Sequence, residues 1–286
     1  MVSNLYFIGM SKNCFNSLKS NIEFLLKFKD FTSHNIDICI IDSDSSDGTK
    51  EYCYELYEQK FINQIIEIDN LEKEYSSRIE RLTICRNEGL NYIGKMIDKE
   101  ALYIPMDMDL DLFSLTSFEE LEKIINTFIS RDNFDGLFPF SVPHYYDIFA
   151  LRAAGWVNGN NLLTARNLKD KFKIFSVIFN YLLIFRKQKH IKKFNAPFIR
   201  VESAFGGMGL YKMGVKEFEN YKYDINIDNI NYYSEHIIFN NFFNNLYISC
   251  EWKFPSPMEY TFFNNFTFLE KIIYIMKTLK NDFKNI

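Results

Sequence analysis

Residues 102–111 read LYIPMDMDLD, an apolar run that changes at residue 107 into three carboxylates spaced two residues apart. Successive side chains of a β-strand point to opposite faces, so an extended backbone would put Asp107, Asp109 and Asp111 on one side. Three like charges so placed repel one another unless a cation neutralises them, and hard divalent ions prefer oxygen ligands. The segment therefore predicts a buried strand that ends in a divalent-cation site, with the binding pair left open among the three aspartates.

Two other kinds of protein also use closely spaced carboxylates of this type. An EF-hand loop that started at Asp107 would need Gly at its sixth position and Glu at its twelfth, where this chain has Leu112 and Phe118. A haloacid-dehalogenase phosphatase places Asp-x-Asp after a strand, usually near the N-terminus and with Thr or Val two residues later, where this chain has Asp111. The EF-hand is excluded, and a metal-dependent phosphatase with Asp107 as its nucleophile stays as an alternative.

The chain before this segment alternates between strand-like and helix-like stretches. Short apolar runs predict strands, and longer stretches predict helices between them, over residues 5–8, 18–28, 36–41, 50–60, 65–68, 81–97 and 102–106. Such alternation predicts an α/β fold with a Rossmann-type, mainly parallel sheet and helices on both of its faces. The ligand crevice of such a sheet lies beyond the carboxyl ends of its strands. From residue 113 the pattern loosens, with a helix expected near residues 118–128 and a strand near 136–140.

A second polar motif follows the strand predicted over residues 36–41. Residues 40–49 read IIDSDSSDGT, in which Asp42 and Asp44 can accept hydrogen bonds from a nucleobase imide or from ribose hydroxyls. Gly48 permits a tight turn before the next helix. No Gly-x-x-x-x-Gly-Lys precedes that helix, so the motif is not a phosphate-binding P-loop. Helix capping by Asp47 or Thr49 is the structural alternative for these side chains.

Composition narrows the classes of partner and compartment. The chain has 33 basic and 37 acidic residues among 286, a net charge of −4, whereas proteins that bind a phosphate backbone are normally basic. Nucleic acid is therefore not expected as the main partner. The five cysteines form no Cys-x-x-Cys pair, which argues against a disulfide framework or a zinc cluster. No signal-peptide pattern opens the chain, and we expect a cytoplasmic location.

A basic stretch in the middle of the chain brackets an apolar segment. Nine Lys or Arg and one acid lie between Arg166 and Lys193, and they flank the apolar residues 174–185. This segment is too short to cross a hydrocarbon core, which needs about 20 residues. It could lie in an anionic membrane interface at the inner face of the membrane, or it could be a core-docked helix with solvated basic ends. Residues 268–284 predict a second amphipathic, mildly basic helix.

Several motifs together resemble one enzyme family. The stretches that carry the resemblance are residues 40–49, 81–89 (RLTICRNEG), 102–111, 146–152 (YDIFALR), 202–211 (ESAFGGMGLY) and 234–240 (SEHIIFN). They look like the nucleotide-sugar-dependent glycosyltransferases of GT-A fold. The last three narrow the resemblance to the branch of fungal capsule-associated α-mannosyltransferases and related bacterial surface-polysaccharide enzymes. The likeness spans about residues 4–250, although that branch often lacks a full Asp-x-Asp.

The resemblance implies a reaction and a division of the chain. A sugar would pass from a nucleotide-diphosphate donor to a glycan or lipid-linked glycan acceptor in surface polysaccharide synthesis, with Mn²⁺ or Mg²⁺ as cofactor. Residues 1–112 would form the nucleotide-binding half and residues 113–260 the acceptor-side half of one domain. Residues 261–286 would form a C-terminal amphipathic helix, and the protein would be peripheral at the membrane.

The resemblance also implies roles for individual residues. A metal held by Asp107 and Asp109 would neutralise the departing phosphate oxygen, and His236 would complete its shell. Glu235 would act as the base that takes the acceptor proton, its pKa raised by partial burial. Further contacts to donor or sugar are expected from Asp42, Asp44, Arg86, Asn87 and the backbone amides of Gly206 and Gly207.

Alternatives stay open for these residues and for the whole chain. Arg86 could form a surface salt bridge with Glu88 or another acid, and His236 could be a hydrogen-bonded core residue. Residues 144–147 offer aromatic faces and one carboxylate to an acceptor sugar. A non-catalytic sugar-nucleotide or glycan-binding protein at the membrane is the main alternative function.

Overall fold

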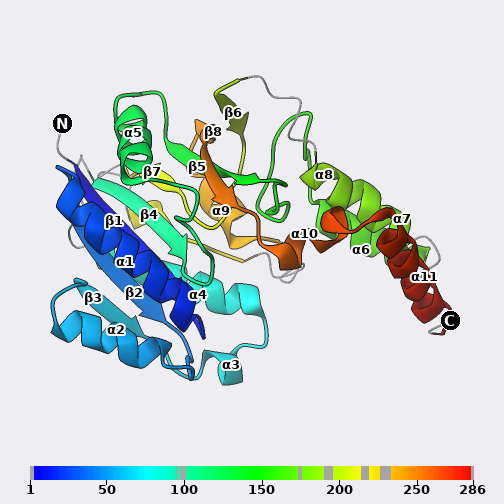
Figure 1. Cartoon of the computed structure of the whole chain (residues 1–286), viewed down its shortest axis with the longest axis horizontal. Helices are drawn as coiled ribbons and strands as arrows, with labels where there is room; N and C mark the ends of the chain where they lie inside the picture. Colours follow the sequence, from blue (N-terminus) through cyan, green and yellow to red (C-terminus); the bar gives the residue numbers. More distant parts are fainter. Residues whose placement is uncertain are drawn as a thin grey trace.

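The computed structural model describes residues 3–94, 96, 101–172, 176–189, 196–213, 219–225 and 233–284. Three of the basic residues in the stretch noted above, Lys173, Lys192 and Lys193, lie outside these ranges. The described residues form an α/β domain around one sheet, from which a group of helices extends to one side (Figure 1).

One sheet of eight strands runs through the domain in the order β3-β2-β1-β4-β7-β5-β8-β6. Strands β1 to β4 are mutually parallel and β5 is parallel to β8, whereas β7 and β6 run antiparallel to their neighbours. The strands are β1 (Asn4–Ser11), β2 (Asn35–Asp42), β3 (Gln64–Glu67), β4 (Ala101–Asp107), β5 (Gly136–Val142), β6 (Phe198–Val201), β7 (Leu210–Lys212) and β8 (Leu246–Pro255). The expected, mainly parallel α/β sheet is confirmed, with four adjacent parallel strands, β1 to β4, in the first half of the chain.

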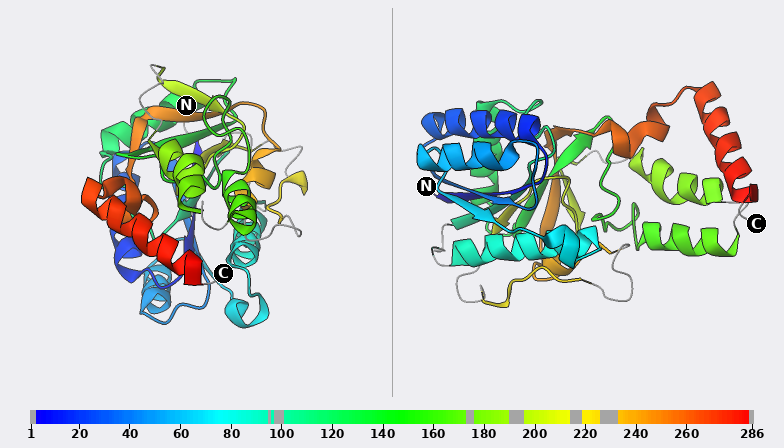
Figure 2. Two further views of the ribbon diagram at one scale, coloured as in Figure 1. Left: turned by 90° about the vertical axis from the view of Figure 1, so that its right-hand side faces the viewer. Right: turned by 90° about the horizontal axis from the view of Figure 1, so that it is seen from below.

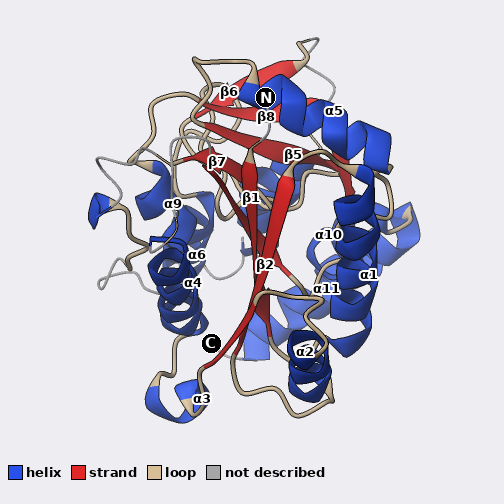
Figure 3. Ribbon diagram, turned by 90° about the vertical axis from the view of Figure 1, so that its left-hand side faces the viewer, coloured by secondary structure: helices blue, strands red, loops and turns tan. Residues whose placement is uncertain are grey.

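Helices cover both faces of the sheet because the strand side chains alternate between two apolar clusters. Leu5 and Phe7 of β1 pack with α1 (Phe15–Phe31) and α2 (Thr49–Glu58) in one cluster. Tyr6 and Ile8 belong to the other cluster, which includes α4 (Arg78–Gly94) and α9 (Glu235–Asn240). Helix α5 (Phe118–Ile129) joins the first face, and Figure 3 shows the two layers on opposite sides of the sheet.

The register of the parallel strands places their polar ends at one edge. Ser11 of β1 pairs with Asp42 of β2, and Met10 of β1 pairs with Asp107 of β4. A short helix, α3 (Leu71–Glu74), and the first turn of α4 lie at the same edge. The polar motifs that the sequence placed after separate strands are therefore neighbours in space.

The remaining helices form what we call the helical appendage, made of described residues 161–172, 176–189 and 258–284. Its elements are α6 (Asn161–Lys171), α7 (Ser176–Asn180), the π-helical turn η2 (Tyr181–Phe185), α8 (Arg186–Gln188), α10 (Met258–Asn265) and α11 (Phe268–Lys284). Figure 2 shows these helices projecting away from the sheet. Asn264 ties the two halves of the appendage together by donating to Phe185 O at 3.0 Å and to Gln188 Oε1 at 2.8 Å.

Residues 174 and 175 of the apolar segment lie outside the described residues, and the remainder, residues 176–185, has both buried and exposed apolar side chains. Val177 and Phe185 are buried in the appendage, whereas Ile178, Tyr181 and Leu182 are exposed. Within the described parts of the chain, every helix is too short or too polar to span a bilayer. The boundaries expected at residues 112 and 260 stay predictions.

Candidate functional site

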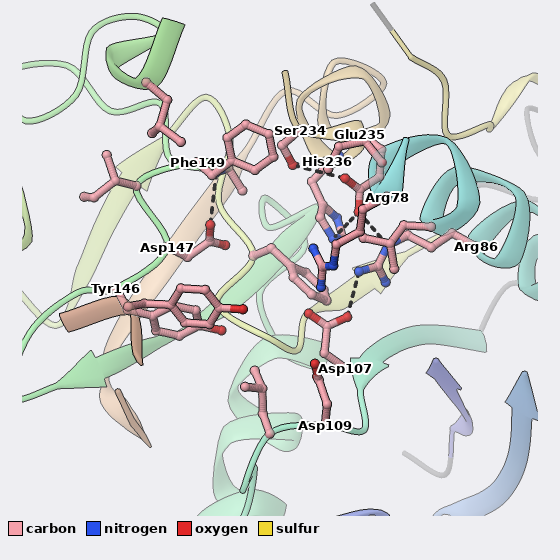
Figure 4. Close-up of a pocket in the computed structure, with 18 of the residues that line it drawn as sticks. Arg78, Arg86, Asp107, Asp109, Tyr146, Asp147, Phe149, Ser234, Glu235 and His236 are labelled. Carbon is pink, nitrogen blue, oxygen red and sulfur yellow. Dashed lines mark hydrogen bonds and ion pairs between the residues drawn. The ribbon is translucent and has the colours of Figure 1, made fainter. Parts of the chain in front are cut away.

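Two adjoining pockets open at the carboxyl ends of the parallel strands. The larger pocket, of about 430 Å³, lies between the sheet edge, α9 and the helical appendage, and the smaller pocket, of about 270 Å³, lies over the ends of β1 and β2. Four residues line both pockets: Arg78, Leu82, Asp107 and Asp109. Figure 4 shows the charged side chains that converge on the larger pocket.

The three aspartates of residues 107–111 do not share one face, which corrects the expectation for an extended strand. Strand β4 ends at Asp107, whose backbone N–H donates to Gly207 O at 2.8 Å, and the chain then turns. Asp107 and Asp109 both line the pockets, whereas Asp111 lines neither of them. The turn therefore selects Asp107 and Asp109 as the candidate metal pair.

These two carboxylates repel each other. Burial by the surrounding protein, followed by the charge of Asp107, raises the pKa of Asp109 from its ordinary value of 3.8 to about 6. Arg78, the first residue of α4, acts in the opposite direction. Two oxygen ligands beside a pocket fit Mg²⁺ or Mn²⁺, which commonly takes one or two protein carboxylates and completes its shell with substrate phosphate and water.

Arg86 forms a buried ion network with two carboxylates from distant parts of the chain. Its Nη2 donates to Asp107 Oδ1 at 2.7 Å, and its Nε donates to Glu235 Oε1 at 2.8 Å. The Phe205 ring lies 4.8 Å from the guanidinium carbon. Burial alone would lower the pKa of Arg86, but the charges of Asp107 and Glu235 raise it well above its ordinary value. Arg86 therefore stays cationic, and it pairs with acids of the site instead of with Glu88.

Glu235 and His236 begin helix α9, where Ser234 caps the helix by accepting from the His236 N–H. The Phe205 ring stacks on the His236 imidazole at 3.7 Å. Burial and the nearby Arg86 charge lower the pKa of His236 well below its ordinary value, so the ring is neutral. Neither ring nitrogen of His236 makes a hydrogen bond with a described residue, although its Nε2 lies 3.5 Å from Glu235 Oε1. The imidazole is therefore able to accept or donate one hydrogen bond to a ligand in the larger pocket.

The described residues contain no group of three or more His, Cys, Asp or Glu side chains arranged to hold a metal ion. His236 lines the same pocket as Asp107 and Asp109, but it is not gathered with them as a third ligand. Metal ligation by His236 stays a prediction, and the two aspartates carry the candidate site.

Asp42 and Asp44 are engaged in hydrogen bonds within the protein that join the loop after β2 to neighbouring segments. Asp42 is fully buried and accepts from the hydroxyls of Ser11 and Ser45. Asp44 accepts from the backbone N–H groups of Asn70, at 2.6 Å, and Glu72, at 3.0 Å. Neither aspartate lines a pocket, whereas the intervening Ser43 lines the smaller one. Donor contacts by Asp42 and Asp44 stay predictions.

Asn87 and the two glycines also make internal contacts. The Asn87 side chain forms a reciprocal pair with the backbone of Tyr223, donating to its carbonyl at 3.0 Å and accepting from its N–H at 2.8 Å. The Gly206 N–H donates to Asp147 Oδ2 at 2.9 Å. Ligand binding by Asn87, Gly206 and Gly207 stays a prediction, and the described contacts position neighbouring residues instead.

Three cations line the smaller pocket, and local sequence patterns do not predict the position of one of them, Arg78. Lys12, Arg78 and Arg81 line this pocket. Lys12 pairs with Glu72, and Arg81 donates to Tyr75 O at 2.6 Å. The sequence pattern predicts that this helix begins at residue 81, whereas α4 begins three residues earlier, at Arg78. Arg78 therefore lies in the first turn of α4, beside the pocket, which the pattern does not predict.

Asp147 is a further carboxylate of the larger pocket, beside Asp107, Asp109 and Glu235. It accepts from the N–H groups of Ala150, at 3.1 Å, and Gly206, at 2.9 Å. Burial, and then the charges of Asp107 and Glu235, raise its pKa, although the two backbone hydrogen bonds oppose this shift. The expected carboxylate of residues 144–147 therefore faces the pocket that contains Glu235.

Gly207→Ala is expected to destabilise the protein by roughly 2–4 kcal/mol. Gly207 has φ +90°, and a Cβ atom there would lie 2.5 Å from Leu110 Cδ1 and 3.1 Å from the Tyr146 hydroxyl. Gly155→Ala is the matched control, because Gly155 has φ +76° and no atom within 4 Å of the added Cβ. The control should lose only about 1 kcal/mol from backbone strain. Urea denaturation measures both values, and equal losses would contradict close packing at Gly207.

Mn²⁺ is expected to raise the melting temperature more at about pH 7 than at about pH 5, because protons compete with metal for Asp109. Without metal, the stability of the protein itself changes with pH in the opposite direction. The pKa of Asp109 is about 6 in the folded protein, above its ordinary value, so ionisation opposes folding and stability falls as pH rises from about 4 to about 6. Scanning fluorimetry at three pH values, with and without Mn²⁺, measures both effects. A Mn²⁺ shift independent of pH would argue against ligation by Asp109.

Comparisons with known proteins find resemblance only among solved structures. No protein-family model matches the chain, and no curated protein matches its sequence. The crystal structure of S. aureus TarS residues 1–349 is 11% identical, with a TM-score of 0.48, and the match covers 98% of this chain and 65% of that one. The same fragment in complex with UDP-GlcNAc gives the same TM-score and identity, over 66% of its length.

Two further structures are less similar in fold. Mannosyl-3-phosphoglycerate synthase from Rubrobacter xylanophilus is 10% identical, with a TM-score of 0.36, over 73% of this chain and 53% of that one. The mannosyltransferase PcManGT from Pyrobaculum calidifontis, in complex with GDP-Man and Mn²⁺, is 12% identical, with a TM-score of 0.36, over 53% of this chain and 39% of that one. This chain thus spans less than two thirds of each of these neighbours. The resemblance is one of backbone arrangement, and the capsule-associated branch stays a proposal.

Proposed function

We propose that this protein is a glycosyltransferase that moves a sugar from a nucleotide-diphosphate donor to a glycan or lipid-linked glycan, assisted by Mn²⁺ or Mg²⁺. The observation that carries the proposal is the position of Asp107 and Asp109, which line both pockets at the carboxyl ends of the parallel strands. In α/β sheets this edge is the usual ligand crevice.

The two pockets differ in charge in a way that suits the two halves of such a donor. Apart from the shared aspartates, the smaller pocket is lined by three cations, Lys12, Arg78 and Arg81, and one acid, Glu72, and its cationic groups would bind a diphosphate. The larger pocket contains Asp147 and Glu235, whose oxygens suit sugar hydroxyls. In this arrangement the bond that breaks would lie between the pockets, beside Asp107 and Asp109.

The protein groups near the leaving phosphate have separate tasks. A divalent ion held by Asp107 and Asp109 would supply Lewis-acid stabilisation of the departing phosphate oxygen. Arg86 fixes the orientation of Asp107 through a 2.7 Å hydrogen bond. Arg78 would add positive charge at the boundary of the two pockets.

Glu235 is the proposed base for the acceptor hydroxyl. Its Oε1 accepts from Arg86, and the Ser234 hydroxyl lies 3.5 Å from its Oε2. Oε2 is therefore the oxygen proposed to take the proton, while Oε1 stays bound to the guanidinium. Asp147, in the same pocket, would bind acceptor or donor hydroxyls.

A thermal-shift screen of nucleoside diphosphates with and without Mn²⁺ tests the proposal, because a ligand that binds only the folded state raises the melting temperature. We expect at least one nucleotide to stabilise the protein more with Mn²⁺, and the matching nucleotide sugar to be hydrolysed slowly. Donor binding without any turnover would favour a non-catalytic binding protein. An aspartyl-phosphate trapped at Asp107 would favour the phosphatase, although Arg86 already occupies one oxygen of that side chain.

Surface polysaccharide synthesis and a peripheral location at the inner face of the membrane belong to the same proposal. They are supported by the basic residues of the helical appendage and by the exposed apolar side chains beside them. The appendage also contributes Leu162, Ile184, Gln188 and Tyr260 to the larger pocket. An acceptor carried by a lipid would reach the pocket from this side.

A further inference from the structure

The helical appendage carries most of the exposed large apolar side chains of the described chain. Eleven of the eighteen such residues lie in it, although it is a minor part of the structure. They are Phe172, Ile178, Tyr181, Leu182, Met258, Tyr260, Phe268, Leu269, Ile272, Ile273 and Met276. Contiguous exposed apolar surface of this kind marks a site of interaction with a protein or a membrane.

The exposed apolar side chains of helix α11 lie along one side of the helix. Its inner side packs through Tyr274, whose ring contacts Phe262, Phe263 and Phe266. At 100° per residue, the five exposed apolar residues Phe268, Leu269, Ile272, Ile273 and Met276 form one stripe along the opposite side. Phe268 is 81% exposed, and Leu269 and Met276 are each 65% exposed. The helix is therefore apolar on the side that faces away from the protein.

Charge indicates which partner the stripe meets. Among described residues whose side chains are placed, the appendage has eight Lys or Arg (Arg166, Lys169, Lys171, Arg186, Lys187, Lys189, Lys271, Lys277) and three acids (Asp170, Glu259, Glu270). The chain as a whole has a net charge of −4. An apolar stripe on an appendage with an excess of basic residues fits an anionic bilayer surface, where apolar side chains enter the interface and cations meet lipid headgroups.

We propose that the helical appendage docks on an anionic membrane surface through the outer stripe of α11 and the basic residues of the same appendage. This surface is distinct from the one suggested by residues 166–193 alone, because three of the four most exposed large apolar side chains of the described chain, Phe268, Leu269 and Met276, belong to α11. The docking rests on the proposed function in one respect only. If the protein is a glycosyltransferase, the larger pocket, which the same appendage lines, opens toward a lipid-linked acceptor.

Flotation with liposomes tests the docking without any donor or acceptor. The full chain is mixed with vesicles of phosphatidylcholine and phosphatidylglycerol, or of phosphatidylcholine alone, and we expect it to float only with the anionic vesicles. The triple variant Phe268→Ser, Leu269→Ser and Met276→Ser should reduce the bound fraction by about tenfold or more. The variant Lys169→Gln, Lys171→Gln and Lys277→Gln should do the same, and added salt should weaken wild-type binding.

Matched substitutions on the sheet domain provide the control. Phe61 and Leu115 are 45% and 48% exposed and lie outside the appendage, so Phe61→Ser with Leu115→Ser should leave flotation unchanged. The melting temperature of each variant checks its fold. If both triple variants bound the anionic vesicles as well as the wild type does, the proposal would be overturned. A stable wild-type dimer, observed by sedimentation velocity without vesicles and not formed by the apolar triple variant, would also overturn it.

The same proteins separate this proposal from the proposed activity. Asp109→Asn should still float with anionic vesicles, because Asp109 lies at the pockets and not in the appendage. The apolar triple variant should keep the nucleotide-dependent thermal shift. Flotation without any nucleotide response would support the docking and contradict the glycosyltransferase.

Discussion

Arg86→Met is expected to lower the free energy of unfolding by about 3–5 kcal/mol, because it leaves the Glu235 carboxylate buried without its cation. Arg86 is 1% exposed and Glu235 is 3% exposed, so water cannot replace the lost partner. For a chain of this size the melting temperature should fall by roughly 5–15 °C. Thermal and urea denaturation measure the loss.

Two further variants identify the cause of that loss. Arg86→Met combined with Glu235→Leu removes both charges, so it should recover much of the stability that the single change loses. Lys123→Met removes an exposed partner of Glu251, in a pair whose side chains are 71% and 66% exposed, and it should cost less than about 1 kcal/mol. An Arg86→Met protein as stable as the Lys123→Met control would show that the buried network does not hold the site together.

Asp109→Asn is expected to reduce metal-dependent donor turnover by about 10²–10³-fold. The amide keeps the size of the side chain but removes an anionic ligand beside the leaving phosphate. Without metal at about pH 7, the variant should be no less stable than the wild type, since the change removes repulsion between Asp109 and Asp107. The measurement is release of nucleoside diphosphate from the donor selected by the thermal-shift screen, with melting temperature recorded in parallel.

Asp111→Asn is the matched control for this prediction. Asp111 belongs to the same acidic run but lines neither pocket. Its replacement should leave turnover and the Mn²⁺ response within about twofold of the wild type. Equal activity of the two variants, or equal loss in both, would contradict the assignment of Asp107 and Asp109 as the metal pair.

The regular elements could be predicted from sequence because local patterns specify them. The apolar run before Asp107 predicted a strand over residues 102–106, and the structure has β4 over Ala101–Asp107. The helix predicted near residues 118–128 is α5 over Phe118–Ile129, begun by a capping box between Ser117 and Glu120. Alternation of strands and helices then required a sheet covered on both faces, since each strand must bury apolar side chains on two sides.

The partners of the polar residues could not be predicted in this way. Arg86 and Glu235 are 149 residues apart in the chain, and their hydrogen bond exists only because α4 and α9 pack on the same face of the sheet. A positive charge in a sequence does not say which carboxylate will face it, and the local candidate, Glu88, was the wrong one.

The sequence by itself determined the α/β architecture and the acidic end of β4, because strand periodicity and the change from apolar to charged residues are local properties. Only the tertiary structure decided that the chain turns after Asp107, which separates Asp111 from the pockets, and that Asp42 and Asp44 accept hydrogen bonds from Ser11 and Asn70 of other segments. Burial explains the difference. A polar group withdrawn from water must take its hydrogen bonds from whatever the fold places beside it, and that neighbour is set by contacts between distant segments.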